Sequence, residues 1–123
     1  MKYTVEVSGE PPVVAITSSG RAHVADFLGV EEFLSDSRFQ PGMLVLADHS
    51  ALDLTELSSA DVQTIGRAYR DFLDRVGQSR IAIVVSQPFA FGLARMAEAY
   101  AGQPAPNQRI FYSRDEAISW LRA

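Results

Sequence analysis

The sequence predicts an α/β domain in which a mixed sheet of four or five strands begins with a hairpin and is flanked by helices. Two uninterrupted apolar runs, Met43–Ala47 and Ile81–Val85, are typical of strands that are covered on both faces, and such strands are usually parallel. Segments with helical periodicity alternate with these strands. With 123 residues and a hydrophobic fraction of 47%, the chain is expected to form one domain over residues 1–123.

The first part of the chain predicts a hairpin and a helix. Residues 3–7 alternate between apolar and polar, as in a half-buried strand. The break at Gly9–Pro12 leads into a β-branched run over Val13–Thr17, so a hairpin is expected, with Pro12 at the first position of its second strand. Residues 24–35 have the spacing of a helix whose apolar side consists of Val24, Phe27, Leu28, Phe33 and Leu34.

The second part of the chain predicts three more helices. The first covers residues 62–76 and ends at Gly77; its expected core side is Val62, Ile65, Tyr69, Phe72, Leu73 and Val76. The second begins at Pro88; its expected core side is Phe89, Leu93, Met96, Ala97 and Tyr100. A strand over residues 109–112 then leads to a capping box at residues 113–116. The last helix is expected to dock on the sheet through a buried Trp120, beside Phe111 or a neighbour.

Composition excludes several classes of function. The net charge of −4 and the pI near 5.0 argue against a nucleic-acid-binding surface. Lys2 is the only lysine and there is no cysteine, so lysine and thiol chemistry are not expected. His23 and His49 lie far apart, which leaves no signal for a metal site, and no cofactor is expected. The apolar runs are far shorter than the ~18 residues of a membrane span, so a cytoplasmic protein is expected.

An acid, an imidazole and a hydroxyl follow one another at Asp48, His49 and Ser50. The buried strand of residues 43–49 is expected to reach its carboxyl end here, where ligands of open α/β sheets gather. An aspartate and a serine at a strand end also satisfy loose backbone N–H groups, so a purely structural role is the alternative. Because consecutive side chains of an extended chain diverge, the three residues do not form a catalytic triad, and no catalytic residue is assigned.

The residues after this strand predict the start of a helix. Ser58 or Ser59 is expected to be its N-cap, with Asp61 in the first turn. No glycine-rich phosphate-binding loop follows any predicted strand.

Three segments together resemble the SpoIIAA-like superfamily, which contains the STAS domains and a STAS/SEC14-like branch. They are LVLADHSALDLTELSSADV (residues 44–62), RIAIVVSQPFAFGLARMAEAYA (80–101) and RIFYSRDEAISWL (109–121). The resemblance covers nearly the whole chain and implies a sheet of four or five strands with flanking helices. It also implies a small bacterial protein without an assigned activity, and its SEC14 side implies apolar ligands.

STAS antagonists of anti-sigma factors carry a switch serine after the same strand, in a pattern that resembles D-x-S-G-V-x-F-x-D-S-S-G. The positions of this chain that match it are Asp48, Ser50, Leu52, Leu54 and Ser58. Ala51 replaces the glycine, Glu56 replaces the second aspartate, and Leu57 replaces the phosphorylated serine. The resemblance therefore does not carry the phosphorylation switch to this chain.

Two functions of different classes follow. The first is a non-catalytic regulatory or protein-interaction module, with another protein or a second copy of the chain as its partner. The second is a small apolar or anionic ligand site, or a modest enzyme, in the crevice at the carboxyl ends of strands 43–49 and 80–86.

The candidate surface for both consists of Asp48, His49, Ser50, Ser86, Phe89, Phe91 and Arg95. If Phe89 faces the core, Phe91 and Arg95 share an exposed helix face. A pocket beside Asp48 would favour the ligand, and a flat apolar patch would favour the module.

Overall fold

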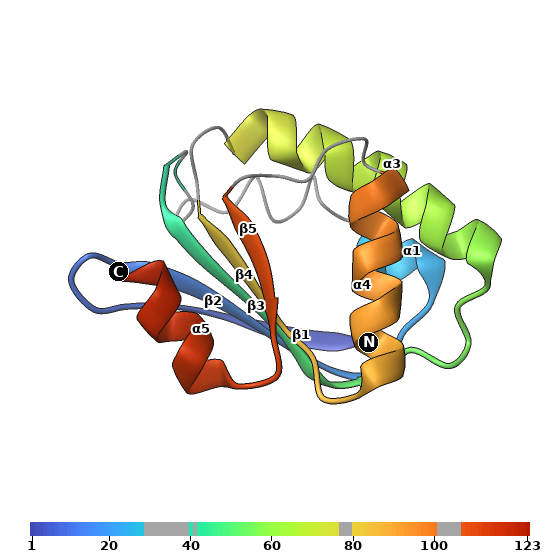
Figure 1. The fold of residues 1–123 in the computed structure, drawn as a ribbon, viewed down its shortest axis with the longest axis horizontal. Coiled ribbons are helices and arrows are strands. Elements are labelled where there is room, and N and C mark those ends of the chain that lie inside the picture. Colours follow the sequence, from blue (N-terminus) through green and yellow to red (C-terminus); the bar gives the residue numbers. More distant parts are fainter. Residues whose placement is uncertain (29–39, 41, 77–79, 101–106) are drawn as a thin grey trace.

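A five-stranded mixed sheet forms the centre of the protein (Figure 1). The computed structural model describes residues 1–28, 40, 42–76, 80–100 and 107–123, apart from the side chains of residues 72, 73, 75 and 76. The strands are β1 (Lys2–Ser8), β2 (Val13–Arg21), β3 (Leu44–Asp53), β4 (Ile81–Val84) and β5 (Gln108–Phe111). They lie side by side in chain order, β1-β2-β3-β4-β5.

The sheet begins with the predicted hairpin. β1 and β2 are antiparallel, with Val5 opposite Ile16 and Val7 opposite Val14, and Gly9 adopts a positive φ of 88° in the connection, a conformation that glycine reaches without steric cost. Pro12 comes just before β2 rather than inside it. The remaining neighbours, β2–β3, β3–β4 and β4–β5, are parallel, so the predicted mixed sheet is confirmed.

β3 is longer than the sequence suggested, and this corrects the prediction for Asp48. Its pairing with β4 stops at Asp48, opposite Val84, but its pairing with β2 continues to Asp53, opposite Arg21. Residues 48–50 therefore lie within β3 and not after its end. The sequence misleads here because the polar second half of β2 looks like a loop, although its backbone still offers partners to β3.

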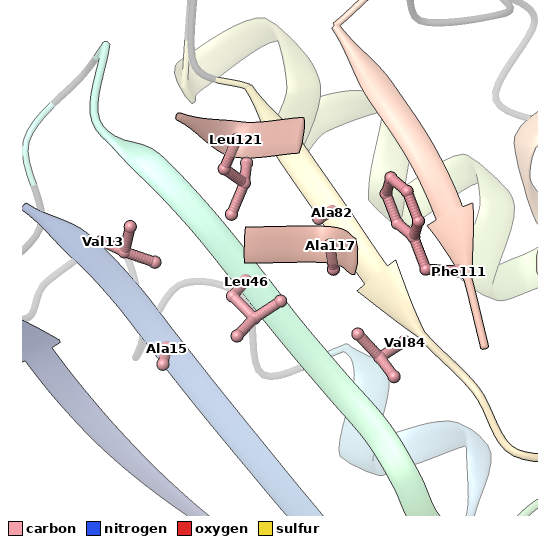
Figure 2. Packing of buried hydrophobic residues seen from close by; sticks show 8 residues of the cluster. All are labelled: Val13, Ala15, Leu46, Ala82, Val84, Phe111, Ala117 and Leu121. Atoms are coloured by element: carbon pink, nitrogen blue, oxygen red, sulfur yellow. The ribbon is translucent and has the colours of Figure 1, made fainter. Parts of the chain in front are cut away.

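One face of the sheet is covered by α5 (Arg114–Leu121). The buried cluster beneath it is shown in Figure 2 and consists of Val13, Ala15, Leu46, Ala82, Val84, Phe111, Ala117 and Leu121. The ring centroid of Trp120 lies 5.7 Å from that of Phe111, which confirms the predicted contact, but Trp120 is half-buried and not buried as predicted. The Ser113 Oγ accepts a hydrogen bond from the Glu116 N–H at 3.2 Å, so Ser113 is the N-cap, as predicted.

The other face is covered by α1 (Val24–Phe27), α3 (Ser59–Val76) and α4 (Pro88–Tyr100) (Figure 1). The predicted helix over residues 24–35 is seen as α1, and its later apolar positions, Phe33 and Leu34, lie outside the described residues. None of the helices in the described parts of the chain is both long and apolar enough to span a membrane.

α3 begins where the sequence predicts. The Ser58 Oγ accepts a hydrogen bond from the Asp61 N–H at 3.1 Å, and the Asp61 carboxylate accepts one from the Ser58 N–H at 3.0 Å. This reciprocal pair is a capping box. Of the predicted core stripe, Val62 is buried while Ile65 and Tyr69 are half-buried; the side chains of Phe72, Leu73 and Val76 lie outside the described residues.

Candidate functional site

Asp48 is a buried carboxylate that fastens α5 to the sheet. Its side chain points to the α5 face, where Arg114 Nη1 donates to Oδ2 at 2.8 Å. The N–H and the hydroxyl of Ser50 both donate to Oδ1, at 3.0 and 2.5 Å. Burial favours the neutral acid, but these hydrogen bonds and the charge of Arg114 outweigh it and hold the pKa of Asp48 below its usual value. Both carboxylate oxygens of Asp48 therefore already accept hydrogen bonds, and the one to Arg114 links α5 to β3. No sequence pattern indicates Arg114 as the partner of Asp48, because the two residues are 66 positions apart.

His49 points to the opposite face of the sheet, as the alternation of a strand requires. Its ring meets Phe27 edge-on at a centroid distance of 6.0 Å, and its Nδ1 is buried without a hydrogen-bond partner among the described residues. Burial lowers the pKa of His49 to about 4, although the charge of Asp48 acts in the opposite direction. The imidazole is therefore neutral at physiological pH. The structure separates Asp48 from His49, as expected for consecutive strand residues.

Ser50, within β3, and Ser86, just after β4, meet next to the point where the pairing of these two strands stops. Ser86 Oγ donates to the carbonyl oxygen of Ser50 at 2.8 Å, so the structure brings together two residues that the sequence predicted to be neighbours. Both hydroxyls donate to an oxygen atom, Ser50 to Asp48 and Ser86 to Ser50. The Ser86 hydrogen bond links the segment after β4 to β3.

The predicted core side of α4 is partly wrong. Phe89 is 54% exposed, and Met96 and Tyr100 are also exposed, whereas Leu93 and Ala97 are half-buried. The inward side is instead built around Ala90, Leu93, Ala94 and Ala97, which line a cavity. The cause is steric, because small side chains allow α4 to lie close to the sheet and to α3. A methyl group at Gly66 of α3 would come within 2.7 Å of the Ala97 carbonyl oxygen.

Phe91 and Arg95 do not share one exposed face. Phe91 is half-buried against the cluster of Val85, Ala90 and Ile110, and its ring stacks on Tyr112 at 5.2 Å with an interplanar angle of 19°. Arg95 is exposed, and its Nη1 lies 3.9 Å from a carboxylate oxygen of Glu98.

Tyr112 was missed by the sequence reasoning, and it is 54% exposed. Its position immediately after the buried Phe111 was the available signal, since a strand residue next to an inward one points the other way. We call the surface formed by Ser50, Ser86, Phe89, Phe91 and Tyr112 the carboxyl edge. The parallel strands end there, at the lower side of the sheet in Figure 1.

A cavity of about 110 Å³ lies between the sheet and the α3–α4 pair. Its walls are mainly apolar: Phe27, Leu54, Leu57, Val62, Ile65, Ile83, Val85, Ala90, Leu93, Ala94 and Ala97. His49 also lines it, but none of the other six candidate residues does. The cavity therefore lies behind the carboxyl edge, and not in the crevice that the sequence suggested beside Asp48.

The remaining polar residues of the cavity wall form a connected group. The Tyr69 hydroxyl donates to the side-chain oxygen of Gln108, and the Gln108 amide donates to Glu98 at 2.7 Å. Burial and the nearby Glu98 charge raise the pKa of Tyr69, so its hydroxyl keeps its proton. No sequence pattern indicates this group, because its members come from α3, α4 and β5.

The described residues contain no group of three metal-binding side chains that could hold an ion. No protein-family model and no curated protein matches the sequence. The structure is similar to the crystal structure of an anti-sigma factor antagonist from Mycobacterium paratuberculosis, with a TM-score of 0.59 and 17% sequence identity, covering 99% of this chain and 96% of that one. The chain therefore has the fold of that anti-sigma factor antagonist, and this confirms the SpoIIAA-like fold that the resemblance implied.

Proposed function

We propose that this protein is a non-catalytic regulatory module that acts in the cytoplasm by binding another protein. The observation that carries the proposal is the likeness in fold, over almost the full length of both chains, to a protein named as an anti-sigma factor antagonist. A protein so named works by contacting a protein partner. The fold alone hosts many functions, so the proposal also needs a surface that fits a partner.

The carboxyl edge is our candidate for that surface. It exposes two large aromatic side chains, Phe89 and Tyr112, and the Phe91 ring stacks beneath Tyr112 and supports it. Aromatic side chains are enriched at protein interfaces and often contribute most to binding. Arg95 lies further along α4 and is exposed, where it can extend the contact. Asp48 and His49 belong to the framework behind this surface.

The polar groups near the carboxyl edge favour binding over catalysis. Asp48 is held as a carboxylate by Ser50 and Arg114, and its lowered pKa makes it a poor general base. The Ser50 hydroxyl donates to the Asp48 carboxylate, whose lowered pKa makes it a weak base. The Ser86 hydroxyl donates to a backbone carbonyl oxygen, which cannot accept its proton. His49 faces away from both serines, into the cavity.

Control by phosphorylation of a STAS-type serine is not part of the proposal. Leu57 occupies the matching position and has no hydroxyl group. The next residue, Ser58, uses its Oγ to cap α3. A phosphate at Ser58 would lie at a helix N-terminus, where negative charge is stabilising.

Two partners are proposed for the carboxyl edge, an anti-sigma factor and a second copy of this chain. The test measures light scattering of the purified protein over a range of concentrations, and calorimetric titration with anti-sigma factors encoded in the same genome. Phe89→Ser with Tyr112→Ser should weaken the complex by at least about tenfold, because aromatic hot spots typically contribute more than 1 kcal/mol each.

The matched control is Tyr3→Ser with Val7→Ser, which removes two exposed apolar side chains from β1. This variant should keep the native affinity. A protein that stays monomeric at every concentration and binds no anti-sigma factor would contradict the proposal. Equal weakening in both double variants would place the interface elsewhere than the carboxyl edge.

A further inference from the structure

The cavity between the sheet and the α3–α4 pair is lined by none of the five residues of the carboxyl edge. A ligand in this cavity does not depend on the proposed function. The volume of the cavity is about 110 Å³. An engineered apolar cavity of roughly 150 Å³ stays dry and binds benzene, so the space here is suited to a molecule of that size class. A phospholipid is far too large for it.

The position of His49 sets the chemistry of the cavity. The ring lines the sheet wall, and its Nδ1 is buried with no partner among the described residues. A buried polar atom without a partner destabilises the fold, because it loses its hydrogen bond to water and gains none in return. Among the buried side-chain nitrogen and oxygen atoms of the described residues, this nitrogen is the one that lacks a hydrogen bond.

The opposite polar wall of the cavity is already satisfied internally. The hydroxyl of Tyr69, the amide of Gln108 and the carboxylate of Glu98 bind one another, and Glu98 also lies 3.9 Å from Arg95. This group does not need a ligand to complete it. A ligand is therefore expected to make its polar contact at His49 and to lie against apolar side chains elsewhere.

We propose that the cavity is a binding site for a small, planar, uncharged molecule with one hydroxyl group, of the phenol class, whose hydroxyl bonds to His49 Nδ1. A hydroxyl both donates and accepts, so it fits either tautomer of a neutral imidazole. The apolar walls around Ile65, Ile83 and Leu93 suit an aromatic ring. A charged ligand is disfavoured, because those walls do not compensate a buried charge.

The test compares phenol with toluene, which has nearly the same shape but no hydroxyl. Each is titrated into the native protein and followed by NMR, through the backbone amides and the ring nitrogens of His49. Phenol should produce saturable shifts at His49 Nδ1 and at amides of β3, α3 and α4. It should bind at least about tenfold more tightly than toluene, since the hydroxyl satisfies a buried group that toluene leaves unpaired.

Three variants assign the effect to the cavity. His49→Leu should make the affinities for phenol and toluene equal within about twofold, because the polar contact is gone. Ala94→Leu fills the cavity and should abolish binding of both. His23→Leu is the matched control: this side chain is 65% exposed and is not among the described residues that line the cavity, so the preference for phenol should be unchanged.

Four results would overturn the proposal. They are no saturable binding of phenol to the native protein, equal affinities of the native protein for the two probes, shifts that map outside the cavity, and a preserved preference for phenol in His49→Leu. If His49→Leu does not fold, the His49 ring nitrogens of the native protein and the Ala94→Leu variant still decide the matter. Failure of phenol to bind would leave the carboxyl edge and its protein partner unaffected, since the two tests use different surfaces.

Discussion

The two faces of the sheet share the same central strands but differ in how closely their side chains pack and in whether their polar groups are paired. On the α5 face, Leu46 lies in a close-packed cluster, and the next residue on that side, Asp48, has its charge paired with Arg114. On the other face, Val85 and Ala90 are buried, but a cavity remains beside them and the imidazole nitrogen of His49 is unpaired. The comparison shows that one strand can serve a face packed for stability and a face that retains space for another molecule.

The largest expected effect tests the difference in packing. Leu46→Ala removes a fully buried side chain from the α5 face and should cost about 3–5 kcal/mol of unfolding free energy. Leu93→Ala removes the same atoms from the cavity wall, where the side chain is half-buried and already faces empty space, and should cost about 1–2 kcal/mol. Denaturant titration measures both. Equal losses would mean that the two faces are packed alike.

The second prediction concerns pH and distinguishes Asp48 from His49. The pKa of His49 is about 4 in the folded protein against 6.5 for an ordinary histidine. The unfolded chain therefore binds more protons between these values, and stability should fall as the pH drops from 6.5 to 4. We expect the free energy of unfolding to fall by about 1–3 kcal/mol over this pH range. His49→Leu should remove that loss.

Asp48 acts in a different pH window. Its folded pKa is below the ordinary value of 3.8, so its contribution is complete above that pH and is lost only as the pH falls further, through the folded pKa. Unfolding measured from pH 7 down to pH 3 separates the two groups. A His49→Leu variant with the same pH profile as the native protein above pH 4 would contradict the assignment.

The third prediction tests the close approach of α3 and α4 beside the cavity. A Cβ at Gly66 would lie 2.6 Å from the Tyr100 Cβ and 2.7 Å from the Ala97 carbonyl oxygen, so Gly66→Ala should destabilise the protein by about 1–3 kcal/mol. Gly92 is also helical, but it has open space around it. Gly92→Ala should therefore stabilise by up to about 1 kcal/mol, through helix propensity alone. Thermal unfolding that ranks the two variants in the opposite order would place the helix contact elsewhere.

The smallest expected effect is the loss of a helix cap, which should cost about the same stability on both faces of the sheet. Ser58 caps α3 on the cavity face and Ser113 caps α5 on the other, so Ser58→Ala and Ser113→Ala should each cost about 1 kcal/mol. Ser119→Ala is the control, because this serine is exposed within α5. Chemical denaturation of the three variants checks this. A much larger loss at one cap would show that the faces also differ in how their helices begin.

Most of the fold could be predicted because its signals are local. The apolar run before Asp48, the proline at the start of α4 and the serine caps each act within a few residues. The alternation of strands and helices along the chain predicted a mixed sheet with helices packed on it, but it did not predict the spatial order of the strands. The length of β3 could not be predicted, because residues 49–53 are held by a partner strand whose own sequence there is polar.

The candidate site was harder to predict, because its decisive contacts join distant segments. Ser50 and Ser86 could be expected to meet, since parallel strands end at one edge. The pairing of Asp48 with Arg114 and the stacking of Phe91 on Tyr112 depend on where α5 and β5 dock. The orientation of α4 was misjudged because large apolar residues such as Phe89 were expected to define the inward side, whereas close helix packing selected alanines.

The strand order has a consequence for how the protein reaches its native state. Because parallel crossovers share one handedness and the strand order never reverses, the described helices between strands, α1, α3 and α4, cover one face. Among the described elements, α5, which follows the last strand, is the helix that covers the other face (Figure 1). During synthesis, the surface around Val13 and Leu46 therefore stays bare until residues 114–121 leave the ribosome. Until then the nascent chain presents an apolar sheet face to the cell, and the docking of α5 is the step that ends this exposure.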